Sequence, residues 1–114
     1  DIARADLMRR VLPVLDDLDR AIAAARAAGR EGALADGVAL IRERLRQAMA
    51  AEGVEEIATA GTPFDPSVAE AVSTESTTDP GKNGLVVEEI ERGYRLGGAL
   101  LRPARVRVAR LTEE

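Results

Sequence analysis

The spacing of apolar residues changes near residue 53, and this change constrains the fold of the 114-residue chain more than any other feature. Before it, apolar side chains recur every three or four residues, which is the period of one face of an α-helix. After it, short apolar runs and alternation take over, as in Arg105-Val106-Arg107-Val108, which is typical of β-strands. We therefore expect an α+β protein with a helical region over 1–53 and a small, mostly β domain over 54–114.

Two apolar stripes make up the helical region, separated by a glycine-containing break around Gly29 and Gly32. The first stripe consists of Leu7, Val11, Val14, Leu18, Ile22 and Ala25, and the second of Leu34, Val38, Ile41, Leu45 and Met49. The short break predicts an antiparallel helical hairpin that ends at Gly53. Pro13 lies inside the first stripe, so we expect either a kink there or the start of a new helix.

Both stripes are broader than one neighbouring helix covers, and the chain has few large side chains to cover the rest, since aromatic residues make up only 2% of it. Apolar surface left exposed on that scale marks an interaction site. The hypothesis that follows is that a second copy of the chain covers this surface, which gives a dimeric four-helix bundle. The alternative is that the C-terminal half covers the hairpin. The expected dimer residues are Val11, Val14, Leu18, Ile22, Val38, Ile41, Leu45 and Met49.

The second half of the chain reads as about five short strands separated by turn residues. Strands are expected over 54–58, 85–90, 93–96 and within 100–110. The run Phe64-Asp65-Pro66 predicts a turn that opens a short helical segment through Val72. Gly97 and Gly98 follow a short strand, so we expect a tight turn with a positive φ there.

Composition excludes several classes of function. The chain has no Cys and no His, which removes disulfides, thiol nucleophiles and imidazole metal ligands. The Asp16-Asp17-x-Asp19 run points around a helix rather than towards one ion, and Gly81-Lys82-Asn83-Gly84 lacks the residues of a phosphate-binding loop. No run approaches the length of a membrane span, and no signal peptide is visible. We expect a cytoplasmic protein that is not an enzyme and holds no metal or cofactor.

Arginines gather at the C-terminal end, where Arg92–Arg110 contains six of them and no acid. This strip is either a nucleic-acid surface or a solvated strand face that balances the acidic segment Asp65–Glu91. Single-stranded nucleic acid binds on aromatic platforms, and the chain offers only Phe64 and Tyr94. The net charge of −4 also gives no bulk attraction to nucleic acid or anionic lipid. The second interpretation is therefore favoured.

Three blocks of sequence resemble the GrpE family, and together they cover nearly the whole chain. The blocks are Val11-Leu12-Pro13-Val14-Leu15-Asp16-Asp17-Leu18-Asp19-Arg20-Ala21, then Gly37-Val38-Ala39-Leu40-Ile41 with Gly53-Val54-Glu55, and then Phe64-Asp65-Pro66, Glu70-Ala71-Val72, Gly93-Tyr94 and Leu101-Arg102-Pro103-Ala104-Arg105-Val106-Arg107-Val108. Two positions depart from the family pattern. At the position of Ala69 the family usually has His or Met. At the position of Ala99 some members have an Arg that reaches the chaperone to which these proteins bind.

The resemblance implies a nucleotide exchange factor of DnaK-type heat-shock chaperones. Such proteins are homodimers with long paired helices, a four-helix bundle and a β wing that engages the chaperone's nucleotide-binding domain and promotes ADP release, with no nucleotide bound by the exchange factor. Only residues 1 to about 10 would belong to the long helix, and since the chain begins with Asp1 we expect a piece of a longer protein.

The resemblance also implies which residues contact the chaperone: Ala24, Phe64, Pro66, Ile90 and Val108. Two other functions stay open at this point. One is a homodimerisation module without exchange activity, and the other is a nucleic-acid binder that uses the arginine-rich strands.

Overall fold

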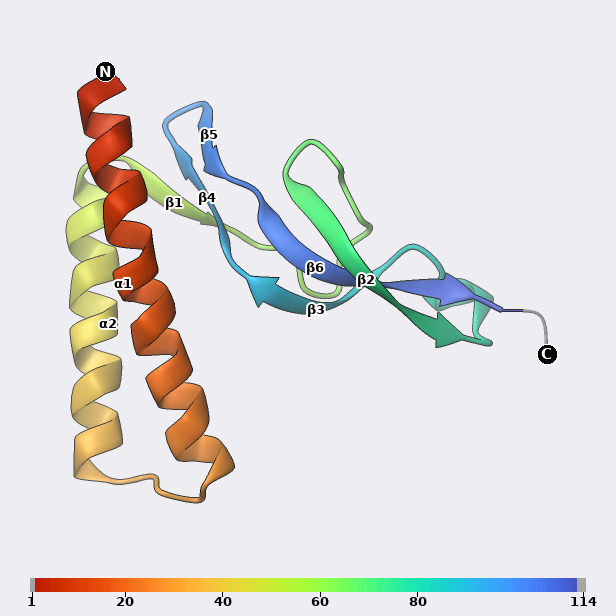
Figure 1. The fold of residues 1–114 in the computed structure, drawn as a ribbon, viewed down its shortest axis with the longest axis horizontal. Coiled ribbons are helices and arrows are strands. Elements are labelled where there is room, and N and C mark those ends of the chain that lie inside the picture. Colours follow the sequence, from red (N-terminus) through yellow and green to blue (C-terminus); the bar gives the residue numbers. More distant parts are fainter. Residues whose placement is uncertain (1, 113–114) are drawn as a thin grey trace. The chain divides into compact units, whose positions relative to one another are not determined.

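The computed structural model describes residues 2–112, and the chain divides into two compact units, Asp1–Val54 and Glu55–Glu114. The first unit holds two helices, α1 (Ile2–Ala27) and α2 (Ala33–Ala51). The second holds short strands and one 3-10 turn (Figure 1). The expected fold class, an α+β protein with a helical hairpin followed by a small β domain, is confirmed.

The helix α1 continues through Pro13 as one element, so a new helix does not begin there. Leu12 and Leu15, on either side of the proline, are only 1% and 0% exposed, and their burial helps to hold the helix across the missing hydrogen bond. Pro13 itself is exposed. Packing has therefore outweighed the local preference of proline.

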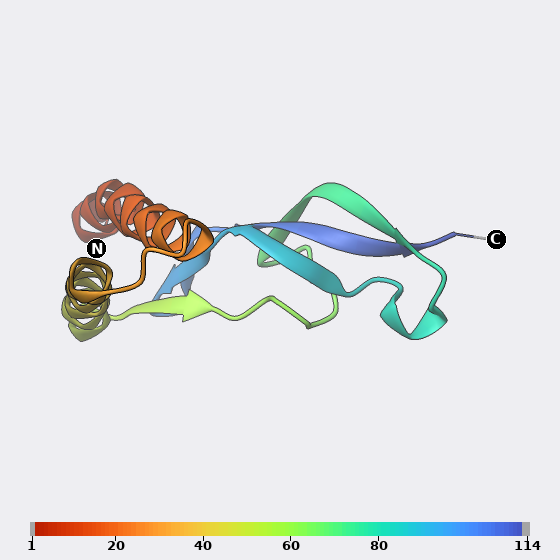
Figure 2. The same ribbon diagram turned by 90° about the horizontal axis from the view of Figure 1, so that it is seen from below.

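The hairpin that joins the helices depends on a glycine. Gly29 has a φ of 67°, which turns the chain at the end of α1, and the amide of Arg30 donates to the carbonyl of Ala25. The two helices lie side by side, as Figure 2 shows. Asp19 of α1 accepts a hydrogen bond from Nε of Arg42 of α2 at 2.9 Å, and this ion pair links them.

The β unit consists of two three-stranded sheets. The first has the order β1 (Val54–Ile57), β4 (Gly93–Leu96) and β5 (Ala99–Arg102), and the second has the order β2 (Ala69–Thr77), β6 (Ala104–Leu111) and β3 (Val86–Glu91). In the second sheet the central strand β6 runs parallel to β2 and antiparallel to β3. The long loop between β2 and β3 contains a 3-10 turn, η1 (Pro80–Lys82).

One expectation for this half is wrong. The segment expected to be helical through Val72 is instead the start of β2, because Ala69 and Ala71 pair with Ala104 and Val106 of β6. The run over 100–110 is two strands, β5 and β6, since Pro103 lacks the amide hydrogen that would continue one ladder. The described residues thus form six strands rather than about five.

The core of the second sheet is a cluster of small apolar side chains, with Phe64 packed against it. Its members are Ala69, Val86, Ala104, Val106 and Val108. At the crossing of the two sheets, Gly93 lies so close to β6 that a Cβ there would be 2.6 Å from the backbone nitrogen of Ala104. In the β4–β5 turn, Gly97 has a φ of 59°, whereas Gly98 does not have a positive φ.

Candidate functional site

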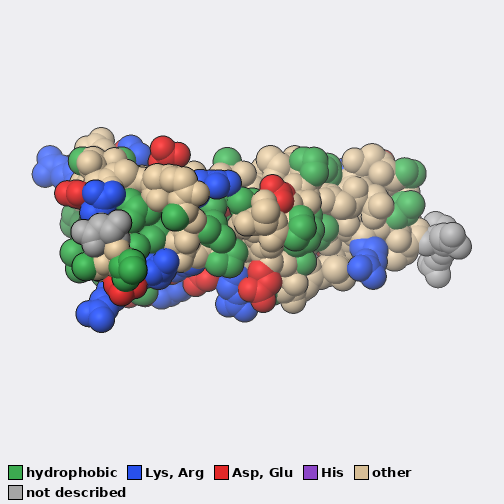
Figure 3. Space-filling model, turned by 90° about the horizontal axis from the view of Figure 1, so that it is seen from above, with side chains coloured by type: hydrophobic (Ala, Val, Ile, Leu, Met, Phe, Trp, Pro, Cys, Tyr) green, Lys and Arg blue, Asp and Glu red, His purple; other side chains and the backbone are tan. Residues whose placement is uncertain are grey.

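A row of large apolar side chains is exposed on the helical unit. Leu7 and Val14 of α1 are 56% and 49% exposed, and Leu34 and Ile41 of α2 are 83% and 58% exposed. Each pair is spaced by seven residues, so its members lie on one face of their helix. Hydrophobic side chains reach the surface of this unit between charged ones, as Figure 3 shows on one face.

The expected dimer residues fall in and beside this row. Val14 and Ile41 are exposed, and Met49 is buried with 4% of its surface accessible. The other five are half-buried: Val11, Leu18, Ile22, Val38 and Leu45. The exposed row and its half-buried flank together form an apolar strip along both helices.

In the β unit, the turn at Phe64-Asp65-Pro66 is fixed by hydrogen bonds at both ends. The amide of Phe64 donates to the carbonyl of Gly84 at 2.9 Å. The Asp65 Oδ1 accepts from the amide of Ser67 at 2.9 Å and from its hydroxyl at 2.7 Å. These two bonds favour the carboxylate and hold the pKa of Asp65 below its ordinary value, with a smaller contribution from the charge of Arg95. The turn presents Pro66 to solvent.

The residues expected to contact a chaperone differ in what they expose. Pro66 is exposed, and Ile90 on β3 is 50% exposed. Phe64 is half-buried against the core cluster, and Val108 belongs to that cluster with 9% of its surface accessible. Ala24 is exposed on α1, in the other compact unit. Among the expected contact residues of the β unit, Pro66 and Ile90 are therefore the two that are exposed.

A polar network that the sequence does not predict lies where the two sheets meet. Arg92, between β3 and β4, contacts Glu56 of β1 (Nη1 to Oε2, 2.9 Å) and Glu89 of β3 (Nε to Oε1, 3.5 Å). Glu89 also accepts a hydrogen bond from the buried hydroxyl of Thr59 at 2.7 Å. The only sequence signal was the mixture of acidic and basic residues over 88–92, which does not predict these partners.

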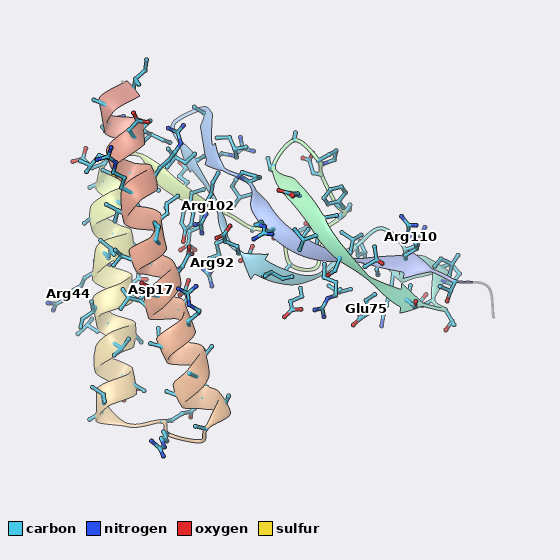
Figure 4. The ribbon with its side chains drawn as sticks, viewed as in Figure 1. Asp17, Arg44, Glu75, Arg92, Arg102 and Arg110 are labelled. Atoms are coloured by element: carbon cyan, nitrogen blue, oxygen red, sulfur yellow. The ribbon has the colours of Figure 1, made fainter. Side chains whose placement is uncertain are left out.

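A second arginine completes this network. Arg102 of β5 donates from Nε to the carbonyl oxygen of Arg92 at 2.8 Å, and its Nη1 lies 3.5 Å from Oε1 of Glu91. Its guanidinium also lies over the ring of Tyr94, 5.4 Å from the ring centre. Figure 4 shows Arg92 and Arg102 close together where β3, β4 and β5 meet. We call these residues the junction network: Glu56, Thr59, Glu89, Glu91, Arg92 and Arg102.

Arginines of β6 also lie opposite carboxylates. Arg107 contacts Glu88 of β3 (Nη1 to Oε1, 2.9 Å) and donates from Nε to the hydroxyl of Ser73 on β2 at 3.3 Å. Arg105 is in register with Glu70 on one side and with Glu91 on the other. Along these strands the arginine-rich segment is thus matched by acidic residues of its neighbours.

Within residues 2–112, no three His, Cys, Asp or Glu side chains are grouped so that they could hold a metal ion. Over the same residues, neither helix combines the length and the apolar character that crossing a membrane requires.

Comparison with known proteins gives a consistent result. The family model for GrpE matches residues 1–110. The chain is 43% identical to a Protein GrpE of Thermus thermophilus over 107 residues, which are 94% of this chain and 57% of the relative. It is 38% identical to Protein GrpE of Tetragenococcus halophilus over 104 residues, which are 91% of this chain and 54% of the relative. The chain spans about half the length of the curated relatives it matches.

Proposed function

The chain belongs to the GrpE family, and we propose on that basis that it is an adenyl-nucleotide exchange factor for a DnaK-type chaperone. It binds the chaperone's nucleotide-binding domain, opens the nucleotide cleft and promotes ADP release during protein folding and the heat-shock response in the cytoplasm. The observation that carries this proposal is the family match over residues 1–110, which includes both the helical hairpin and the β unit.

The proposed mechanism requires differential binding and no bond-making by this chain. If the exchange factor binds the open cleft more tightly than the closed, ADP-holding one, it shifts the chaperone towards the open state and ADP leaves. By reciprocity, ATP that closes the cleft weakens the binding of the exchange factor and releases it. A tenfold loss of ADP affinity requires a difference of only about 1.4 kcal/mol between the two states.

The proposed contact surface is that of the β unit. Pro66 and Ile90 present exposed apolar surface, and the hydrogen-bonded turn at 64–67 fixes one of them in place. Phe64 packs against the core cluster that contains Val108; in this proposal both contribute their accessible parts, and Ala24 adds a contact from α1. A side chain held rigidly loses little entropy on docking, which is how a small interface acquires a strong contact.

We further propose that the chain is a homodimer through its helices. The exposed row at Leu7, Val14, Leu34 and Ile41 supports this, since it leaves large apolar side chains in water unless a partner covers them. A second copy presents the same row and closes a four-helix bundle around a two-fold axis.

Release of a fluorescent ADP from the cognate chaperone, followed by stopped flow with and without the chain, tests this function. We expect faster release, saturating with the concentration of the chain. A dimeric chain that binds no chaperone and leaves the release rate unchanged would instead be a dimerisation module. Salt-dependent binding to single-stranded DNA, without any effect on ADP release, would favour the nucleic-acid alternative.

A further inference from the structure

We propose that Arg92 is a positioning residue for nucleotide exchange: through the junction network it holds the two sheets of the β unit at one fixed angle. This stiffness determines how strongly the chain discriminates between the open and closed chaperone. The inference rests on the exchange function proposed above.

Only a few backbone segments connect the two sheets at the junction. The sheet β1-β4-β5 is joined to the helices through β1, which is separated from the end of α2 by Glu52 and Gly53. The sheet β2-β6-β3 carries the proposed contact Ile90 and packs against Phe64. The described chain passes between the two sheets at three places: at Arg92, at Pro103 and through the loop over 58–68. The backbone between Ile90 and the first sheet therefore runs through these links.

The junction network bridges the two sheets rather than the strands of one sheet. Arg92 connects Glu56 of the first sheet to Glu89 of the second. Arg102 of the first sheet reaches Glu91 of the second and the backbone of the Arg92 link itself. The side chains of Glu89 and Arg102 are only 18% exposed, so water screens these contacts less than it would on an open surface.

Stiffness matters because a ligand shifts an equilibrium only by its difference in affinity for the two states. If the sheets bent easily about the junction, the contact surface would follow the cleft as it closes, and the chain would bind the open and closed states almost equally. A rigid β unit fits the open cleft and fits the closed cleft poorly, so its affinities for the two states differ. Loosening the junction should therefore reduce discrimination while leaving the contact surface itself intact.

The test compares affinity for two states of the chaperone's nucleotide-binding domain, nucleotide-free and ADP-bound, by isothermal titration calorimetry. For the wild-type chain we expect a preference for the nucleotide-free state of roughly 5- to 150-fold, the usual range of an allosteric coupling. For Arg92→Gln we expect this ratio to fall at least about threefold, with affinity for the nucleotide-free state changed less than about twofold. The maximal ADP release rate should fall with the ratio.

Arg107→Gln is a matched control. It removes an arginine–glutamate contact of the same length, 2.9 Å, and of similar arginine exposure, 39% against 41%, but one that lies within a single sheet. We expect its affinity ratio to equal that of the wild type. Glu56→Gln weakens the other end of the Arg92 bridge and should reproduce the Arg92→Gln ratio in part. Thermal melting of each variant establishes that the β unit is folded at the assay temperature.

A direct measure of stiffness comes from spin labels, since the chain has no natural cysteine. Two cysteines carry the labels. Gly98→Cys places one in the open turn of the first sheet, and Ser76→Cys places the other at an exposed position of β2 in the second sheet. With the labelled chain diluted by unlabelled chain, the distance distribution between the labels should broaden in Arg92→Gln and not in Arg107→Gln.

The outcomes are distinguishable. A wild-type chain that does not accelerate ADP release refutes the proposed function and this inference with it. Wild-type exchange together with an unchanged affinity ratio and an unchanged distance distribution in Arg92→Gln overturns the inference alone. So does a parallel fall of both affinities in Arg92→Gln, because that result makes the arginine a direct contact or a support of the fold.

Discussion

The two units of this chain solve the problem of burying apolar surface in different ways. Of the nine large hydrophobic side chains exposed among the described residues, six lie on α1 and α2 and three on the strands. Those on the helices are 49–83% exposed, whereas those on the strands are 38–50% exposed. The β unit encloses a core cluster of its own, whereas the helical unit buries a few side chains and leaves most of its large apolar residues exposed or half-buried.

The distribution of aromatic residues accounts for part of this difference. Both aromatic side chains of the chain, Phe64 and Tyr94, lie in the β unit. The helical unit is rich in alanine, which favours helix but buries little area. A unit built this way gains burial mainly by adding another copy of itself. In the proposed dimer, the second copy supplies that burial.

The largest effect is expected from Ile41→Asp in the proposed dimer seam. A carboxylate forced into an apolar seam loses its hydration without a partner, so dimer affinity should fall at least about 1,000-fold, or about 4 kcal/mol. The melting temperature of the wild-type helices should depend on protein concentration, because dimer formation stabilises them, and that of the dissociated variant should not. Analytical ultracentrifugation over a concentration series measures the dissociation constant.

Leu40→Asp controls for the substitution itself. Leu40 is 52% exposed on the same helix, about 100° around its axis from Ile41, outside the row. We expect this variant to remain dimeric. Equal loss of the dimer in both variants would contradict the seam and indicate general damage to α2.

Gly93→Ala should cost the β unit about 2–3 kcal/mol, because the added Cβ meets backbone rather than a flexible side chain. The helical unit should keep its far-ultraviolet helical signal while the β unit melts earlier, which separates the stabilities of the two units. Gly98→Ala enters open space and should leave the melting curve unchanged. Chemical denaturation followed by amide signals of β6 tests this, and equal effects of the two alanines would refute the close approach.

A smaller effect, on binding and not on folding, is expected from Ile90→Ala. Truncating an exposed contact should weaken chaperone binding by about 1–2 kcal/mol and slow ADP release, while the β unit melts as before. Leu111→Ala removes a similarly exposed side chain, 40% accessible, at the far end of β6 and should leave affinity unchanged. Wild-type affinity in the Ile90 variant would exclude this residue from the interface.

The smallest expected effect is the acid dependence of the turn at 64–67. The folded pKa of Asp65 lies below its ordinary value, so its hydrogen bonds to Ser67 stabilise the β unit above the ordinary Asp pKa, about 3.9, and that stabilisation is lost as the pH falls through the folded pKa. Asp65→Asn should lower Tm by a few degrees at most at pH 7. This difference should shrink as the pH falls below about 4. A pH-independent difference would contradict the role of the charge, and Glu75→Gln on exposed β2 controls for the change in net charge.

The sequence was informative where local period decides structure, and less so where pairing decides it. The four-three spacing predicted both helices and their hairpin, because one helix face is a local property. The stretch before Val72 was expected to be helical because it follows the turn at Phe64-Asp65-Pro66, yet pairing with β6, more than 30 residues away, makes its second half a strand. Arg92 and its partners were missed for the same reason: Glu56 lies 36 residues from Arg92 and meets it only in the finished fold.

The placement of β6 also determines when this protein is able to fold. It is the last of the six strands and yet the middle strand of its sheet, so β2 and β3 have no common neighbour until it is present. During synthesis on the ribosome the helical hairpin, held by local contacts, forms early. The edges of β2 and β3 stay unpaired until β6, Ala104–Leu111, has left the ribosome. A chain stopped before that strand keeps its helices and exposes two unpaired strands, which are templates for aggregation.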